Sequence, residues 1–397
     1  MYMQNTYVQQ DKILPPTPPG WLSAPGSLSV SRSLPFMDPL LTISALRTAA
    51  AAGKVRGCTQ VQVESTTRKE TRDGRPFFEV HVVDASDKFT LRAWHDSVAF
   101  PLCGGLQPGT FLEICGEFSL GNYGLDAKEW QCRELTEAER QALLAGNAEQ
   151  GAKVAADFAY LTEVVATLRD PRLRTLGEVY LTEYGERLSR TAAARGNHHA
   201  RRGGLVEHTA QMLRCALALQ PLYPGLNRCL LIAGVLFHDC GKLWENQYQA
   251  DGFAMPFSEY GELLGHIPIG LELVNFLWRR LLGQSEAAAW ATLQPASEQV
   301  RLHLLHLVAS HHGCLEFGSP VVPKTPEAWL LHYVDNLDAK MEMMAHSYAQ
   351  PKAPNSRIFE RVWPLPGSSV RPLESFPEPP PVPPAVELPP LPPLPVA

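Results

Sequence analysis

Seven histidine and aspartate residues constrain the fold of this chain more than any other feature, because each lies at an end or on one face of a segment with helical spacing. They can meet only if those segments pack together as a bundle. Imidazole nitrogen and carboxylate oxygen are the ligands of hydrolytic Mn, Fe, Co and Zn sites. The pattern therefore predicts a metal site in a bundle core that activates water against a phosphate. The seven residues are His208, His238, Asp239, His266, His311, His312 and Asp335.

The residues before position 136 have the pattern of short strands. Apolar and polar side chains alternate over residues 77–82 and again over residues 88–94, with a turn between them. Period-two alternation is typical of half-buried antiparallel strands. Four or five such strands in residues 51–135 predict a small closed β-barrel, of which the OB-fold is the commonest kind.

The residues after position 136 have helical spacing and good helix formers. We expect a helical linker over residues 136–170 and an all-α domain over residues 171–350. The fold class is thus a multi-domain chain with a small β-barrel followed by a helical bundle. The helices of the bundle are predicted near 172–194, 204–219, 226–239, 262–282, 297–311 and 326–346.

Both ends of the chain are rich in proline, over residues 1–50 and 351–397. Such composition favours polyproline II and cannot build a packed core, so we expect disordered ends, with a protein partner as a second role for the tail. The eight cysteines form no CxxC pair and are interpreted as reduced thiols of a cytoplasmic protein. With no signal peptide and no apolar stretch of membrane-spanning length, no membrane association is expected.

The ligand pair His238-Asp239 closes an apolar helix that Gly241 then breaks, so both side chains reach the same place from adjacent backbone positions. Asp239 can give one oxygen to each of two ions and is the expected bridging carboxylate. Four other histidines of this half are interpreted as ordinary core or surface residues. These are His303, His306, His332 and His346.

These motifs resemble the HD phosphohydrolase superfamily, with its ligand order H…HD…D. Three segments narrow the resemblance to the YhaM-like 3′–5′ exoribonucleases, which place an OB-fold before the HD domain. The segments are residues 197–209 (NHHARRGGLVEHT), 310–320 (SHHGCLEFGSP) and 331–340 (LHYVDNLDAK).

The resemblance assigns roles to the seven residues. It implies that His208, the pair His238-Asp239 and Asp335 hold one ion, and that His266, His311 and His312 hold a second. A third ion is not expected, because Gly204 stands where the cyclic-dinucleotide branch has a glutamate. Mn²⁺ or Co²⁺ is favoured, with Fe²⁺ or Zn²⁺ as alternatives. The catalytic residues are then Asp239 and Lys242. The positive charge of Lys242 would offset the negative charge of the phosphate.

Two sets of residues are predicted to contact nucleic acid. Aromatic rings interleaved with arginine on one face of the barrel suit a single strand, because every base can stack and the cation meets the backbone. The basic stretch before the first ligand suits phosphate contacts, although a solvated helix face is the alternative. The two sets are Phe77, His81, Arg92 and Trp94 on the barrel, and His199, Arg201 and Arg202 in the basic stretch.

The leading hypothesis is a metal-dependent 3′–5′ exonuclease that degrades single-stranded RNA to nucleoside monophosphates, with single-stranded DNA as a second candidate substrate. One alternative is a phosphohydrolase of nucleotides or cyclic dinucleotides, with the barrel used for assembly into a homo-oligomer. The other is a non-catalytic nucleic-acid-binding scaffold. A formal net charge of −6 argues against a histone-like binder and leaves room for a local basic groove.

Overall fold

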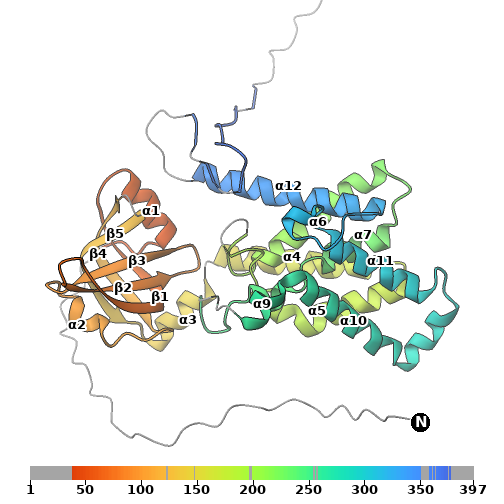
Figure 1. Ribbon diagram of the computed structural model, residues 1–397, viewed down its shortest axis with the longest axis horizontal. Helices are drawn as coiled ribbons and strands as arrows, with labels where there is room; N and C mark the ends of the chain where they lie inside the picture. The colour runs from red at the N-terminus through yellow and green to blue at the C-terminus, as the bar shows by residue number, and fades with distance from the viewer. Residues whose placement is uncertain are drawn as a thin grey trace, which may run out of the picture. The chain divides into compact units, whose positions relative to one another are not determined.

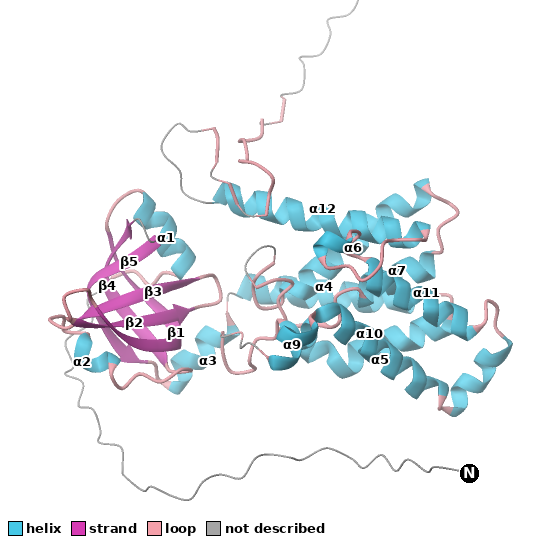
Figure 2. Cartoon of the chain, viewed as in Figure 1, coloured by secondary structure: helices cyan, strands magenta, loops and turns pink. Residues whose placement is uncertain are grey.

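The computed structural model describes residues 38–121, 124–146, 148–195, 199–253, 255, 258–349, 357–359, 361–362, 364–373 and 375–376. Its strands come first in the chain and its long helices follow (Figures 1 and 2). Disorder is expected for residues 1–37 and for the last 21 residues, 377–397, which lie outside those described. His198, in the segment 197–209, also lies outside them.

The first half is a five-stranded antiparallel sheet in the order β3-β2-β1-β4-β5. Its buried face carries Val80, Val82, Phe89 and Leu91, with Phe78 partly buried beside them, in keeping with the alternation over residues 77–82 and 88–94. The strands are β1 (Val55–Glu70), β2 (Pro76–Val83), β3 (Lys88–Trp94), β4 (Phe111–Gly121) and β5 (Gly124–Glu134).

The prediction of a closed barrel is wrong, because the sheet is open between its two outer strands. No backbone ladder joins β3 to β5 in the described residues. Trp130 of β5 spans the gap: it is buried, and its Nε1–H donates to the carbonyl oxygen of Arg92 on β3 at 3.2 Å. The sheet is therefore OB-like in strand order and strongly curved, without the last ladder.

The expectation that every cysteine is reduced is also wrong. Cys58 on β1 and Cys115 on β4 are directly paired across the ladder, with 4.1 Å between their Cα atoms, and form a disulfide. The two cysteines are 57 residues apart in the sequence, and the pairing of β1 with β4 brings them together. The free cysteines are Cys103, Cys132, Cys215, Cys229, Cys240 and Cys314.

The second half is helical and buries one continuous apolar core. Asp170 begins α5 by accepting the backbone N–H groups of Arg172 and Leu173, and Asn227 begins α7 in the same way, so the predicted starts follow from ordinary N-caps. No helix among the described residues is long and apolar enough to cross a membrane. The helices are α3 (Glu137–Ala145), α4 (Ala148–Ala166), α5 (Pro171–Leu188), α6 (Gly204–Leu219), α7 (Arg228–Phe237), α8 (Lys242–Glu245), α9 (Glu259–Leu264), α10 (His266–Leu282), α11 (Ser297–Ser310) and α12 (Pro326–Ala349), with short 3₁₀ turns at Gln220–Leu222, Ser285–Thr292 and Leu315–Phe317.

The structured halves extend beyond the predicted boundaries. Helix α1 (Ile43–Ala51) packs Ile43 and Leu46 into the sheet core, so that half starts before residue 51. A second short helix, α2 (Phe100–Cys103), lies between β3 and β4. Helix α4, predicted as linker, contributes Leu161 and Val165 to the helical core. After α12, Leu365 packs against Met343, so part of the predicted tail is ordered.

One close backbone approach positions the site. A Cβ built on Gly241 would lie 1.9 Å from the carbonyl oxygen of His266 and 2.7 Å from the backbone nitrogen of Gly270. Only glycine lets the turn after Asp239 touch the start of α10. This contact brings Asp239 and His266, which are distant in sequence, to the same place.

We expect Gly241→Ala to lower the free energy of unfolding by about 3 kcal/mol, because backbone atoms must move to admit the methyl group. Gly151→Ala is the matched control: it lies in α4, and its added Cβ would meet nothing within 4 Å. That variant should be stabilised by about 0.5–1 kcal/mol. Urea denaturation of the metal-free proteins measures both, and equal stabilities would contradict the close contact.

Candidate metal centre

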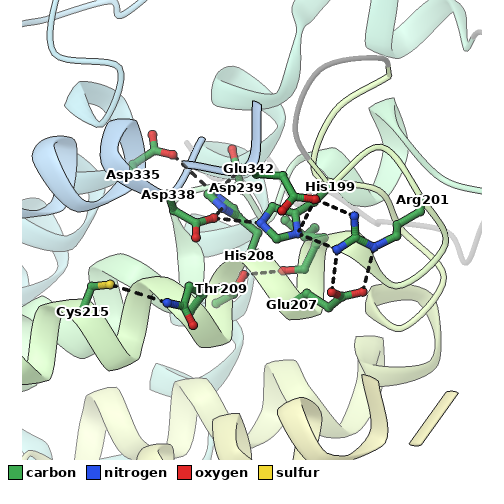
Figure 3. A network of polar contacts seen from close by, with 12 residues as sticks. His199, Arg201, Glu207, His208, Thr209, Cys215, Asp239, Asp335, Asp338 and Glu342 are labelled. Atoms are coloured by element: carbon green, nitrogen blue, oxygen red, sulfur yellow. Dashed lines mark hydrogen bonds and ion pairs between the residues drawn. The ribbon is translucent and has the colours of Figure 1, made fainter. Parts of the chain in front are cut away.

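Five helices bring the seven predicted residues together. His208 lies one turn inside α6, His238-Asp239 follows the last residue of α7, and His266 is the first residue of α10. His311-His312 follows α11, and Asp335 lies within α12. Figure 3 shows His208, Asp239 and Asp335 converging from three of these segments. All seven are part of one cluster of short contacts.

Helix ends are suited to hold these rings because their last carbonyl groups lack partners within the helix. The Nδ1 of His238 lies 2.7 Å from the carbonyl oxygen of Val235, and the Nδ1 of His311 lies 2.8 Å from that of Val308. A carbonyl oxygen can only accept, so each Nδ1 must carry the proton. In a neutral ring the other nitrogen, Nε2, is then unprotonated and free to bind a cation.

The other three histidines are oriented in the same way by other acceptors. The Nδ1 of His312 lies 2.6 Å from the carbonyl oxygen of Phe317. The Nδ1 of His208 lies 2.7 Å from Asp338 Oδ2, and that of His266 lies 3.1 Å from Glu245 Oε2. Each ligand-type histidine therefore has its Nδ1 occupied, and its Nε2 is left for the cluster.

The first half-site, as we call it, contains Nε2 of His208 and of His238, Oδ1 of Asp335 and Oδ2 of Asp239. The two imidazole nitrogens are 3.3 Å apart, and His208 Nε2 is 3.3 Å from Asp335 Oδ1. Asp239 Oδ2 lies 3.2 Å from His238 Nε2 and 3.8 Å from His208 Nε2.

The second half-site contains the other oxygen of Asp239 with His266, His311 and His312. Asp239 Oδ1 lies 3.4 Å from His266 Nε2 and 3.5 Å from His311 Nε2. Ligand-type atoms of His266, His311 and His312 all lie within 4.8 Å of one another. The two oxygens of one carboxylate thus serve two different groups of histidines.

Two observations show that the residues fit divalent ions. Ligand atoms that share an ion at about 2.1 Å lie about 3.0–3.5 Å from each other, which matches most of these spacings. In addition, Asp239 Oδ1, His266 Nε2 and His311 Nε2 are buried without any hydrogen-bond partner among the described residues. Buried polar atoms are rarely left unsatisfied, and three converging ones of this chemistry fit a divalent cation.

The electrostatics of the two half-sites differ. Burial alone would lower the pKa of His208, but its contacts with Asp335 and Asp338 outweigh this and raise the pKa to about 9. Such a nitrogen lies where a positive charge is favoured. In the second half-site, burial lowers the pKa of His266 and His311, and burial with the neighbouring His311 lowers that of His312 to about 4. These rings are neutral at pH 7, as ligands must be.

Lys242 is the cation already present in the cluster. Its Nζ lies 2.7 Å from Asp239 Oδ2, and the residue is buried. Burial alone would raise the pKa of Asp239, but Lys242 and His238 hold it well below its usual range. The structure therefore places the predicted catalytic lysine against the carboxylate shared by the half-sites.

Sequence reasoning missed three residues that orient the ligands. Asp338 is three residues after Asp335 and so lies on nearly the same face of α12, but this spacing does not indicate that its Oδ2 accepts from His208. Glu245 lies beside His266, and no sequence pattern links two residues on separate helices. His332, interpreted as an ordinary histidine, donates from Nδ1 to the carbonyl oxygen of His311 at 2.9 Å and so supports the His311-His312 turn.

The structure offers no room for a side chain at position 204. A Cβ on Gly204 would lie 2.0 Å from the carbonyl oxygen of His199. Next to it, His199 and His208 both bond Asp338 Oδ2, at 3.0 and 2.7 Å. These atoms have hydrogen-bond partners, unlike the orphaned atoms of the second half-site.

The two sets of residues predicted to contact nucleic acid differ in their surroundings. On the sheet, the rings of Phe77 and Trp94 pair across β2 and β3 with centroids 4.8 Å apart, and Trp94 is 45% exposed. Arg92 on the same face lies 3.6 Å from Glu79, and His81 Nδ1 lies 3.0 Å from the hydroxyl oxygen of Thr90.

In the basic stretch, Arg201 bonds Glu207 and Glu342, and Arg202 donates to the carbonyl oxygens of Gln249, Ala250 and Gly252. His199 is buried against Asp338. All three residues contact other parts of the protein around the site. These contacts support neither the interpretation as a solvated helix face nor the predicted contacts with phosphate.

The comparisons with known proteins agree with this site. Residues 205–340 match the family model described as "HD domain". The chain is 31% identical to the 3'-5' exoribonuclease YhaM of Oceanobacillus iheyensis over 301 residues, which is 75% of this chain and 89% of the relative. It is 31% identical to YhaM of Bacillus subtilis over 305 residues, 75% of this chain and 90% of the relative. With YhaM of a Geobacillus strain it shares 37% identity over 205 residues, 52% of this chain and 58% of the relative.

The fold and the paired histidine and aspartate residues define an HD domain, preceded by an OB-like sheet. The length and identity of the matches then place the chain more narrowly. It belongs to the YhaM family.

We expect Asp239→Asn to lose bound metal from both half-sites, because the neutral amide offers a single oxygen and no charge. Metal analysis of dialysed protein by plasma mass spectrometry measures this, with His303→Gln as a control outside the cluster. An Asp239→Asn protein that retained the wild-type metal content would contradict the shared role of this carboxylate.

Proposed function

We propose that this protein is a metal-dependent 3′–5′ exoribonuclease that hydrolyses single-stranded RNA to nucleoside monophosphates. The observation that carries the proposal is the pair of half-sites around Asp239, with ligand atoms orphaned in a buried core. Relatives that span most of the chain are named as exoribonucleases. A scaffold would gain nothing from buried polar atoms without partners.

The ligand set supports two divalent ions, with His208, His238 and Asp335 on one side of Asp239 and the three other histidines opposite. Mixed imidazole and carboxylate donors suit Mn²⁺ or Co²⁺, and also Fe²⁺ or Zn²⁺. When bound, such a pair of ions lowers the pKa of water and clamps the attacking and leaving oxygens of a phosphodiester. Burial holds His266, His311 and His312 in their neutral forms, and Lys242 with His238 holds Asp239 in its anionic form.

We assign Lys242 the role of stabilising the negative charge of the substrate's phosphate. Its ammonium group is buried next to Asp239 and close to where the phosphate of a bound strand would meet the half-sites. A fixed cation in a water-poor site stabilises charge that develops on phosphoryl oxygens. The same lysine balances the carboxylates while no substrate is present.

The sheet face with Phe77 and Trp94 is the proposed binding surface for the strand. The two rings form an exposed, tilted pair, and Arg92 and His81 share their face. Stacking on such rings is tolerant of base identity, as an exonuclease requires. Single-stranded DNA offers the same rings and is a second candidate substrate.

The direct test uses RNA labelled at its 5′ end and incubated with Mn²⁺. We expect a ladder that shortens from the 3′ end and release of nucleoside monophosphates, whereas circular RNA of the same sequence stays intact. Single-stranded DNA, cyclic dinucleotides and free nucleotides are assayed in parallel. Hydrolysis of the small molecules without attack on RNA would overturn the proposal in favour of a nucleotide phosphohydrolase.

Removing both rings in Phe77→Ala/Trp94→Ala should raise KM for single-stranded RNA about tenfold or more, because base stacking contributes about 1–3 kcal/mol per base. The turnover number should change little, since the half-sites are untouched. Val98→Ala, at a residue that is 75% exposed on the same half, is the matched control. An unchanged KM in the double variant would remove this face from the proposal.

Lys242→Gln should lower the turnover number by roughly 10²–10³-fold, as expected for one lost donor to a developing charge. Bound metal should remain at the wild-type level, because the amide removes no ligand. The exposed Lys324 gives the control variant Lys324→Gln. Steady-state kinetics with metal analysis separates the two effects, and loss of metal together with activity would show that Lys242 only organises Asp239.

A further inference from the structure

The carboxylate of Asp338 contacts the metal cluster through a ligand rather than directly. Its Oδ2 accepts the Nδ1–H of His208 at 2.7 Å, while the opposite nitrogen of the same ring lies 3.3 Å from Asp335 (Figure 3). Both acidic residues lie on α12, one turn apart. One helix thus supplies a proposed ligand and the group that orients another ligand.

Asp338 is itself held in place by a second ring. His199 Nε2 lies 3.0 Å from the same Oδ2, and the Nδ1 of His199 lies 3.3 Å from the guanidinium of Arg201 (Figure 3). Arg201 in turn bonds Glu207 through two nitrogens and Glu342 through a third. Asp338 and His199 are both buried, so the contact between them is shielded from water.

The second half-site has one counterpart of Asp338. Glu245, the last residue of α8, has its Oε2 3.1 Å from Nδ1 of His266. The Nδ1 atoms of the remaining ligand histidines all face neutral backbone carbonyl groups, those of Val235, Val308 and Phe317. Each half-site therefore contains one histidine that is backed by a negative charge.

We propose that Asp338 and Glu245 are positioning residues that set the metal affinity of the first and the second half-site separately. This rests on the two-ion site of the proposed function. A carboxylate behind an imidazole fixes the ring and increases the electron density on the nitrogen that binds the ion. Loss of such a partner typically costs 10–100-fold in metal affinity. Neither residue is proposed as a ligand.

The half-sites can be separated by removing one ligand from each. His266→Ala leaves the ligands of the first half-site complete, and His208→Ala leaves those of the second. Asp338→Asn and Glu245→Gln are then added to each background, in the full-length protein stripped of metal. Mn²⁺ binding is measured by calorimetry, and circular dichroism of the metal-free proteins checks that every variant is folded.

In the His266→Ala background, we expect Asp338→Asn to weaken Mn²⁺ binding about 10–100-fold, and Glu245→Gln to change it by less than about twofold. In the His208→Ala background the two effects should exchange. If His208→Ala does not fold, the wild-type protein provides the same test, because each substitution should weaken a different one of two binding steps. Glu342→Gln, a further step from the ligands, should have a smaller effect than Asp338→Asn.

Equal effects of the two substitutions on both half-sites, or no effect of either, would overturn the proposal, as would wild-type protein that binds fewer than two ions. RNA hydrolysis is no part of this readout. A protein that bound two ions with the expected pattern and ignored RNA would therefore contradict the proposed function and support the positioning roles.

Discussion

The carboxylate of Asp239 is the group on which the rest of the helical half depends. It is 3% exposed, and a buried carboxylate costs several kcal/mol unless cations or hydrogen bonds compensate for it. One oxygen faces Lys242 and the first half-site, and the other faces His266 and His311 of the second half-site without a hydrogen-bond partner among the described residues. The helices must therefore place enough imidazole nitrogens around this carboxylate to compensate for its burial. We infer that metal ions held by the same nitrogens provide the rest of the compensation.

Helix ends meet this requirement because they solve two problems at once. A histidine just beyond the last turn satisfies a carbonyl group that the helix leaves unpaired and directs its second nitrogen outward. His238 and His311 do this at the ends of α7 and α11. The approach of Gly241 to the first residue of α10 then adds His266 to the cluster. The same contacts that end the helices assemble the centre.

Local patterns predicted much of this arrangement. The bounds of α6 are those expected from its spacing, and the adjacency of His238 and Asp239 predicted a shared site. Partners that are distant in sequence left no such signal. The disulfide between Cys58 and Cys115 follows from the pairing of β1 with β4, and the sheet is open between β3 and β5, which are also distant in sequence. Glu245 and Asp338 act through rings on other helices, which no spacing within one segment indicates.

The central claim is that one carboxylate is shared by two metal ions, and anomalous X-ray diffraction from crystals grown with Mn²⁺ tests it most directly. We predict two anomalous peaks, one beside Asp239 Oδ2 among His208, His238 and Asp335, and one beside Oδ1 among His266, His311 and His312. A single peak, or two peaks that do not both contact Asp239, would contradict the account.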